Sequence, residues 1–337
     1  MPAQTGQPQP HVTVVVPTLA ADEKLAACLE SLNRQTFAAF ETIVVDNSGR
    51  GVVAARGRVS VIANERNVGF GAAINQAVRQ SSAAFIAVLN DDACANPRWL
   101  ERLVAAMDER PEVGMCASRI VLAGDGRLDS AGMLLCRDGS SKQRGHLECA
   151  ESYSRDEEAL LPSGCAALYR REMLEEIGLF DERFFLYCED TDLGLRARWA
   201  AWECLYVPDA VVEHQYSHSS GRASALKAYY VERNRLYLAV KNLPAGDLLV
   251  APLYSLARYF WHVVYGVRGK GKAAEFQQSG NAAVRLPLYV ARAYLALLPR
   301  LPGLLRERRR MKRRLTTKQF RGLMRRFSIS PRQVAAL

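Results

Sequence analysis

Two adjacent aspartates follow an apolar run in the stretch AFIAVLNDDA, residues 84–93. The run has the composition of a buried strand. Neighbouring carboxylates repel each other, and a divalent cation with oxygen ligands would offset that repulsion and could also hold phosphate groups. A solvated turn before a helix that begins near Pro97 is the alternative interpretation of Asn90, Asp91 and Asp92.

Two further stretches carry polar side chains or glycines next to apolar runs. VVDNS places Asp46 at the end of a strand, where its oxygens could accept hydrogen bonds from a base edge or a ribose. NVGFGAAIN begins a helix with two glycines, the first of them Gly69, and such an entry exposes backbone amides to an anion. A simple tight turn would give the same pattern. Asn67 and Asn75 are the polar companions of these glycines.

The stretch FLYCEDTDLGLRARW places three acids at the start of a helix. At helical spacing Glu189, Asp192 and Arg196 share a face, whereas Asp190 points elsewhere. The functional interpretation is a general base, with Arg196 restraining Asp192 electrostatically. The structural alternative is that acids in a first turn simply complement the helix dipole.

A histidine-containing segment, VVEHQYSHSSG, follows a predicted strand. His214 could complete a metal site, although a lone histidine is more often structural. His218 and Ser219 could approach a phosphate.

The elements that must position these residues follow from apolar periodicity. Strands are predicted at 12–18, 42–48, 59–64, 85–90 and 113–122, and helices at 22–34, 71–80 and 97–109. Such alternation predicts a parallel sheet with helices on both faces, and ligands bind beyond the carboxyl ends of its strands. The residues that end the first four strands, including Asn64 after the third, should therefore converge on one crevice.

The rest of the chain is less regular. We expect hairpins and a mobile loop over 123–160, a strand and then a helix over 164–180, a helix over 189–202 and short strands over 204–214. The polar, proline-rich residues 1–11 are expected to form a disordered lead-in without a signal peptide. The eight cysteines form no CxxC pair, which favours reduced thiols in a cytosolic protein.

Charge divides the chain of 337 residues into two regions. Residues 1–221 contain 21 basic and 31 acidic residues, a net charge of −10, whereas residues 222–337 contain 24 basic and 4 acidic residues, a net charge of +20. The basic region could bind nucleic acid or a membrane. Its long apolar segments, 248–266 and 286–305, are interrupted by charges and predict amphipathic helices at a membrane interface rather than spanning helices.

Seven motifs occur in a fixed order, namely VVVPT, VVDNS, NVGFGAAIN, LNDDA, GCAALYRR, FDERFFLYCEDTDLGLR and VEH. This ordered set resembles the family 2 glycosyltransferases of the GT-A fold, especially their bacterial rhamnosyltransferase-like branch. The match covers roughly 12–240. The resemblance implies an α/β, Rossmann-like domain with a mostly parallel central sheet, followed at 241–337 by a basic, amphipathic helical region.

The resemblance also implies an inverting transfer of a sugar from a nucleotide diphosphate, with Mg²⁺ or Mn²⁺ as cofactor. Asp190 matches the catalytic base, and Asp92 and His214 match the metal-binding positions. Asp46 would hold a uracil or thymine base, and Asp91 would lie near the sugar or ribose. The expected donor-binding residues are Pro17, Thr18, Asp46, Asn67, Gly69, Asn75, Asn90 and Asp91.

The acceptor side is expected to include Gly164, Glu189 and Trp199, although Trp199 and Trp202 are also typical core residues. The branch implies dTDP-L-rhamnose as donor, with a UDP-hexose or a non-catalytic nucleotide-sugar-binding role as alternatives. The expected acceptor is a glycan or a polyprenyl-diphosphate-linked glycan of cell-surface polysaccharide synthesis. Residues 241–337 would hold the enzyme on the anionic inner face of the cell membrane, and no nucleic acid partner is expected.

Overall fold

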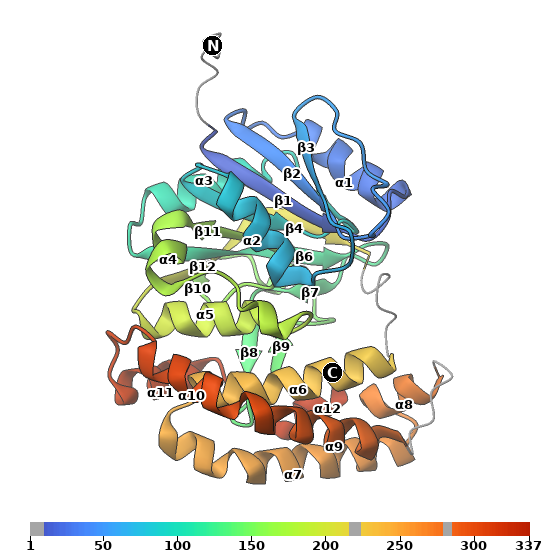
Figure 1. Cartoon of the computed structure of the whole chain (residues 1–337), viewed down its shortest axis with the longest axis vertical. Helices are drawn as coiled ribbons and strands as arrows, with labels where there is room; N and C mark the ends of the chain where they lie inside the picture. Colours follow the sequence, from blue (N-terminus) through green and yellow to red (C-terminus); the bar gives the residue numbers. More distant parts are fainter. Residues whose placement is uncertain (1–9, 216–223, 279–284) are drawn as a thin grey trace.

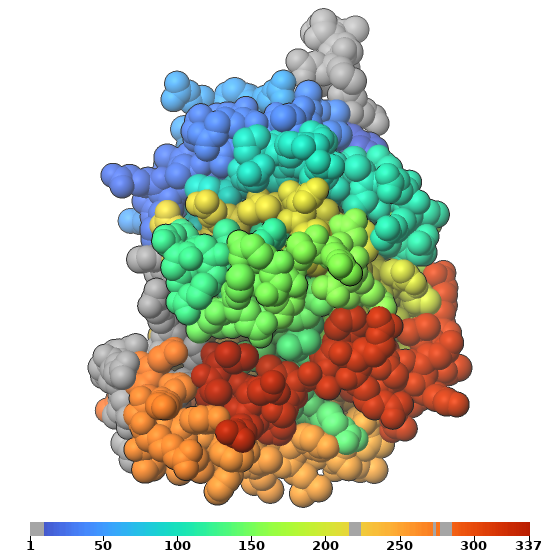
Figure 2. Space-filling view, turned by 180° about the vertical axis from the view of Figure 1, so that it is seen from behind, coloured from blue at the N-terminus to red at the C-terminus, as the bar shows by residue number. Residues whose placement is uncertain are grey.

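The computed structural model of the protein describes residues 10–215, 224–278 and 285–337. Figure 1 shows a central sheet with helices against it, lying over a separate layer of helices from the last third of the chain. Figure 2 shows that these C-terminal helices, in orange and red, cover the end of the molecule opposite the first strands, in blue. The predicted lead-in falls almost entirely outside the described residues.

The central sheet follows the order β10-β12-β6-β11-β4-β1-β2-β3, with β5 beside β12 and β7 beside β6. Its parallel pairs are β1–β2, β1–β4, β2–β3 and β6–β12, and β11 is antiparallel to both β4 and β6. The strands are β1 (Val12–Thr18), β2 (Phe40–Asp46), β3 (Val59–Ala63), β4 (Phe85–Leu89), β5 (Ala93–Ala95), β6 (Val113–Leu122), β7 (Leu128–Ser130), β10 (Glu157–Glu158), β11 (Ala166–Arg170) and β12 (Glu203–His214).

Helices cover the sheet where the apolar periodicity predicts them. They are α1 (Glu23–Asn33), α2 (Phe70–Gln80), α3 (Trp99–Asp108), α4 (Arg171–Ile177) and α5 (Glu189–Trp199). Asp22 caps α1 by accepting hydrogen bonds from two backbone amides of its first turn, at 3.1 and 3.2 Å. β4 is buried at every position, as a strand covered on both faces requires. The predicted fold class, a GT-A-like α/β fold followed by C-terminal helices, is confirmed.

Two details of the less regular part differ from or extend the prediction. Residues 204–214 form one long strand, β12, instead of short strands, because a register shift between Val207 and Val211 lets it continue beside β6. The predicted hairpin consists of β8 (Met133–Leu135) and β9 (Ser141–Gln143), preceding a short 3₁₀ turn, η1 (Ala150–Ser152). This β8–β9 hairpin reaches the C-terminal layer, where Leu135 donates its amide to the carbonyl of Phe327 at 2.9 Å.

The C-terminal layer consists of helices α6 (Ala225–Asn242), α7 (Ala245–Val267), α8 (Gly271–Gln278), α9 (Leu286–Leu297), α10 (Leu301–Arg310), α11 (Thr317–Arg326) and α12 (Pro331–Ala336), with a 3₁₀ turn, η4 (Leu298–Arg300), between α9 and α10. The predicted domain boundary after residue 240 falls inside α6. None of the helices within the described ranges is long and apolar enough to cross a membrane.

A buried ion cluster joins α5 to this layer. Asp192 of α5 is fully enclosed, and its carboxylate accepts hydrogen bonds from Arg196 at 2.9 Å, from Lys241 at 3.0 Å and from Asn242 at 2.8 Å. Burial acts to raise the pKa of Asp192, but the charges of Lys241 and Arg196 outweigh it and hold the pKa below its usual value. The sequence-based pairing of Asp192 with Arg196 is therefore observed.

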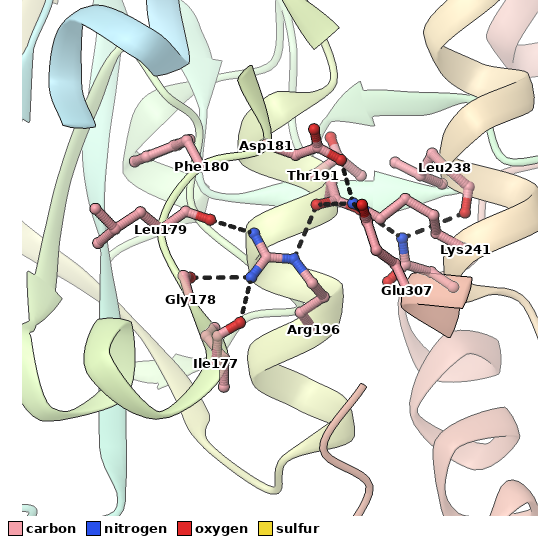
Figure 3. Close-up of polar contacts among 12 residues, drawn as sticks. Ile177, Gly178, Leu179, Phe180, Asp181, Thr191, Arg196, Leu238, Lys241 and Glu307 are labelled. Carbon is pink, nitrogen blue, oxygen red and sulfur yellow. Dashed lines mark hydrogen bonds and ion pairs between the residues drawn. The ribbon is translucent and has the colours of Figure 1, made fainter. Parts of the chain in front are cut away.

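Figure 3 shows how the same cluster extends to both sides. The guanidinium of Arg196 donates to three successive carbonyls, 177–179, at 2.8 to 3.0 Å. Lys241 also donates to Asp181 at 2.5 Å and lies 3.3 Å from Glu307 of α10. The helix that carries Asp190 is thus fixed by charges that come from three separate segments.

Asp192→Asn should destabilise the protein by about 3–5 kcal/mol, because it removes the buried carboxylate that lies between the cations of Arg196 and Lys241. Urea unfolding followed by circular dichroism measures the loss. Glu101→Gln is the control, since it breaks an exposed pair with Arg98 and should leave the urea midpoint nearly unchanged. A midpoint for Asp192→Asn equal to that of the control would contradict a stabilising role for the cluster.

Candidate active site

A cavity of about 1310 Å³ lies between the carboxyl ends of the parallel strands and the C-terminal layer. Most of the predicted site residues line it, although they come from segments far apart in the sequence. The predicted residues that line the cavity are Pro17, Thr18, Asn67, Gly69, Asn90, Asp91, Asp92, Gly164, Glu189, Asp190 and His214. The expected convergence is therefore present for the ends of the first and fourth strands and for Asn47 after the second, whereas Asn64, after the third, does not line the cavity.

The Asn-Asp-Asp motif directs its two carboxylates to different partners. Asp91 accepts a hydrogen bond from the hydroxyl of Thr18 at 2.6 Å, and burial raises its pKa despite that bond. Asp92 lies 3.3 Å from Nε2 of His214. Burial acts to raise the pKa of Asp92, but the hydrogen bond and charge of His214 outweigh it, so the pKa lies below its usual value.

Asp129 is a site residue that the sequence did not identify. Its Oδ2 lies 2.8 Å from Nδ1 of His214, so that His214 stands between two carboxylates. Burial acts to lower the pKa of His214, whereas Cys165 and the hydrogen bonds to both aspartates raise it well above 6.5. Asp129 belongs to a three-residue strand in the irregular region. Only the pairing of β6 with both β7 and β12 brings it next to His214.

Asp92 and His214 are chemically suited to a divalent cation. Carboxylate oxygen and imidazole nitrogen both bind Mn²⁺, and Mg²⁺ is usually held by one or two carboxylates together with substrate phosphates. Within the described ranges no group of three or more His, Cys, Asp or Glu side chains could hold a metal by itself. A cation at Asp92 and His214 would take its remaining ligands from water or from a bound diphosphate, and His214 would have to give up its proton to bind it.

The two acids at the start of α5 occupy different environments. Asp190 accepts hydrogen bonds from the amides of Gly164, at 2.9 Å, and of Thr191, at 2.6 Å; burial raises its pKa, and these bonds oppose the rise. The neighbouring Glu189 is buried, and its Oε2 has no hydrogen-bond partner among the described residues. Burial, and then the charge of Asp190, raise the pKa of Glu189 to about 8. Near neutral pH Glu189 therefore favours its protonated form, whereas the carboxylate of Asp190 is held by two backbone amides.

The turn that leads into α5 has an unusual backbone. Phe185, Tyr187 and Cys188 have φ angles of 63°, 70° and 67°, in the left-handed region that these residue types rarely adopt. The side-chain amide of Asn234, on α6, lies 2.7 to 2.8 Å from the carbonyl oxygens of residues 184, 186 and 187. Asn234 is fully buried, so α6 fixes the backbone from which Asp190 projects.

Gly69 touches the same turn. It has a φ of 94°, and a Cβ at this position would lie 2.5 Å from the carbonyl oxygen of Phe185. The amide of Phe70 donates to that carbonyl at 2.7 Å, and the amide of Gly69 donates to Asn67 at 2.9 Å. The predicted exposure of these amides to an anion is therefore wrong for Gly69 and Phe70, whose donors already have protein partners. The glycine is needed for close approach of two segments.

Three predicted site residues do not line the cavity. Asp46 is buried, and its carboxylate accepts hydrogen bonds from the amides of Ser48 at 2.9 Å and Val53 at 3.1 Å. Asn75 is buried against the backbone of Phe180, with which it exchanges two hydrogen bonds of 2.8 and 3.0 Å.

Trp199 is the third of these residues. Its ring stacks on that of Phe320 with 3.8 Å between the ring centroids, and its indole N–H donates to the carbonyl of Asn242. Trp199 is therefore a core residue, which was the alternative interpretation. Trp202 is buried as well, and its indole donates to Glu176 at 2.9 Å. His218 and Ser219 lie outside the described residues.

The fold and the site together define a glycosyltransferase of the GT-A class. The structure is similar to that of GalNAc-T7 with UDP, GalNAc and Mn²⁺, with a TM-score of 0.54 over 68% of this chain and 48% of that chain, at 16% sequence identity. Residues 13–178 match the family described as Glycosyl transferase family 2. This segment of the chain is a domain of that family.

Relatives with similar sequences include an L-rhamnosyltransferase and an O-antigen biosynthesis protein. The N-acetylglucosaminyl-diphospho-decaprenol L-rhamnosyltransferase of Mycobacterium tuberculosis is 28% identical, over 64% of this chain and 80% of that protein. The O-antigen biosynthesis protein RfbC of Myxococcus xanthus is 28% identical over 64% of this chain, and protein y4gI of Sinorhizobium fredii is 29% identical over 63%. The chain spans only 18% of RfbC and 25% of y4gI.

Glu189→Gln should alter how stability depends on pH. Because the folded-state pKa of Glu189 is raised from 4.5 to about 8, its contribution is fully present below pH 4.5 and is lost as the pH rises through about 8. Glutamine cannot ionise, so the variant should gain stability relative to wild type between pH 5 and pH 8.5 in urea unfolding. Glu203→Gln, at an exposed carboxylate, should show no such trend. An equal difference between Glu189→Gln and wild type at both pH values would refute the raised pKa.

Proposed function

We propose that this glycosyltransferase is inverting and metal-dependent, and that it transfers a sugar from a nucleotide diphosphate to a hydroxyl group of a glycan or lipid-linked acceptor. The observation that carries the proposal is the shared cavity. Asp92 and His214 face it from one side and Asp190 from another segment, so a diphosphate-binding group and a base can act on one substrate.

The residues suggest a direct displacement. Asp190 would take the proton from the acceptor hydroxyl as its oxygen attacks the anomeric carbon opposite the leaving diphosphate. The transition state would resemble an oxocarbenium ion, as in glycoside chemistry generally. The hydrogen bonds from Gly164 and Thr191 would hold the carboxylate of Asp190 in place during this transfer.

The departing diphosphate gains negative charge, and a bound Mg²⁺ or Mn²⁺ would offset it. Asp92 and His214 would hold the cation. Asp129 would orient the imidazole of His214 through its bond to Nδ1, the arrangement usual for metal-binding histidines. Thr18 would keep Asp91 pointed toward the cavity beside them.

The names of two relatives support a specific donor and a specific acceptor for this enzyme. We propose dTDP-L-rhamnose as donor and a lipid-diphosphate-linked glycan as acceptor, because a relative named as an L-rhamnosyltransferase acts on a diphospho-decaprenol and matches over most of its own length. The similarity to RfbC supports a place in cell-surface polysaccharide synthesis. A UDP-hexose donor, or nucleotide-sugar binding without turnover, is the alternative. The proposed location is the cytoplasmic face of the cell membrane.

A panel of nucleotide sugars tests the proposal directly. Purified protein with Mg²⁺ or Mn²⁺ should release dTDP from dTDP-L-rhamnose when a GlcNAc-diphosphate-lipid is present. Release of UDP from a UDP-hexose instead would replace the donor assignment. Donor binding without release of any nucleotide diphosphate, across the panel, would favour the non-catalytic alternative.

Asp190→Asn should lower the rate of transfer by roughly 10²–10⁴-fold, because it removes the base. Donor affinity, measured by calorimetry, should stay within about two-fold of wild type, since the change keeps the shape of the side chain. Asp209→Asn is a matched control at a carboxylate whose side chain is 69% exposed. Near-normal turnover by Asp190→Asn would exclude Asp190 as the base.

Asp92→Ala should abolish the metal dependence of donor binding, because it removes the carboxylate ligand. Asp129→Asn should act less severely and raise the metal concentration for half-maximal activity by about 10–100-fold, as is typical when the partner of a metal-binding histidine is lost. Metal titrations with each variant measure both effects. An unchanged titration for Asp92→Ala would exclude it as a ligand.

A further inference from the structure

One face of α7 is entirely apolar and exposed. Six of its residues are 61–85% exposed and recur every three or four positions, which places them on one side of the helix. We call this set the α7 stripe: Leu249, Leu253, Leu256, Phe260, Val263 and Val267. Every exposed residue of α7 is apolar or glycine. Figure 1 draws α7 along the lower edge of the molecule, on the side of the C-terminal layer away from the sheet.

The charged residues of α7 point inward instead. Asp247 is buried and pairs with Arg137 at 3.0 Å and with Arg321 at 2.6 Å. Arg258 is buried and pairs with Asp138 at 2.7 Å and with Glu232 at 2.8 Å. The charges that interrupt this apolar segment in the sequence therefore lie on the inward side of α7.

Contiguous apolar surface of this kind marks an interaction site, since soluble monomers rarely expose it. The stripe extends over most of a helix of 23 residues, about 34 Å at 1.5 Å per residue. Water is a poor solvent for such a face, so a partner with an apolar interior must cover it.

Charge identifies the chemistry of that partner. Residues 222–337 have a net charge of +20, and three of their four acids, Glu232, Asp247 and Glu307, are engaged in ion pairs with arginine or lysine. Exposed Arg268 and Lys270 directly follow α7. A second copy of the chain would bring like charge to this face, whereas an anionic bilayer offers acyl chains and opposite charge together.

The cavity opens onto the same stripe. Val263 and Val267 belong to the stripe and also line the cavity. The cavity walls near them come from α7, α8 and α9 and are largely apolar, including Phe276, Leu286 and Val290. Val263 and Val267 therefore join the exposed stripe to the largely apolar part of the cavity wall.

Polar residues line the cavity between Asp190 and this opening. Thr191, next to Asp190, lies 3.0 Å from Ser141 of the β8–β9 hairpin, hydroxyl to hydroxyl. Lys142 follows, and its charge, after burial and Arg258, helps to lower the pKa of His262 to about 3. His262 is therefore neutral and lies beside Val263 on α7. The side chains that line the cavity thus change from carboxylates near Asp190, through Lys142, to apolar residues near Val263.

We propose that the α7 stripe lies in the surface of an anionic bilayer and that the acceptor enters the cavity from that bilayer, with its lipid chain between α7 and α9 and its glycan at Asp190. This inference rests on the proposed function, because it assigns the lipid-linked acceptor to the same cavity. It makes the membrane the source of substrate as well as the place of attachment.

A combined variant, Leu253→Gln, Leu256→Gln and Phe260→Gln, tests the bilayer contact, since none of the three residues lines the cavity. Full-length wild type should float with vesicles of phosphatidylcholine and phosphatidylglycerol, and the variant should bind them at least about ten-fold more weakly. Val52→Gln with Leu147→Gln changes exposed apolar residues of the sheet layer and should bind as wild type. Equal binding by wild type and the stripe variant overturns the proposal. A wild-type dimer in light scattering that the stripe variant converts to monomer also overturns it, because a second copy then covers the face.

Transfer assays separate this proposal from the proposed function. GlcNAc-diphosphate is supplied either on a long isoprenoid in those vesicles or on a short, water-soluble chain. The stripe variant should lose at least about ten-fold in transfer to the vesicle-borne acceptor and keep wild-type transfer to the soluble one. Equal activity of wild type and variant on both acceptors overturns only the membrane inference. Absence of transfer by wild type to either acceptor, with every donor of the panel, contradicts the proposed function itself.

Discussion

The side-chain amide of Asn234 holds the backbone on which the proposed chemistry depends. It contacts three carbonyls of a turn in which Phe185, Tyr187 and Cys188 adopt left-handed conformations. Each such residue costs roughly 1–3 kcal/mol, so the turn persists only because its surroundings determine it. The turn directs Asp190 into the cavity. Because Asn234 lies on α6, a helix beyond the segment that matches the family fixes the position of Asp190, the proposed base.

This dependence makes the sheet and the C-terminal layer one working unit. Asp192, two residues after Asp190, binds Lys241 and Asn242 of α6, and Arg235 and Arg258 bind Asp138 of the β8–β9 hairpin. Buried ion pairs contribute little net stability compared with apolar packing, but removal of one partner is severe. Their value here is geometric: they fix which helix faces the cavity and which faces outward.

The sequence predicted what local pattern determines and failed where distant segments meet. The strands ending at Thr18 and Asn90 were predictable because continuous apolar runs bounded by polar residues have few alternatives. Asp129 and Asn234 were not predictable. The role of Asp129 arises from the order of the strands in the sheet, and Asn234 lies on a helix 50 residues after the turn that it contacts. The order of the motifs located the cavity residues. Their spacing could not show that the carbonyl of Phe185 accepts a hydrogen bond from the amide of Phe70, next to Gly69.

Arg258 illustrates why a charge in an apolar segment has two opposite meanings. In the sequence it interrupts the apolar run, but in the fold it turns inward and is neutralised by Asp138 and Glu232. The same residue thereby leaves the outward face of α7 uninterrupted and gives the middle of the cavity a polar wall. A cavity that must receive both a charged head and an apolar chain needs such a graded wall, because a wholly apolar one would desolvate the head without compensation. The ion pairs of Arg258 with Asp138 and Glu232, beneath the α7 stripe, supply this change from a polar to an apolar wall. Apolar packing of equal volume could not supply it.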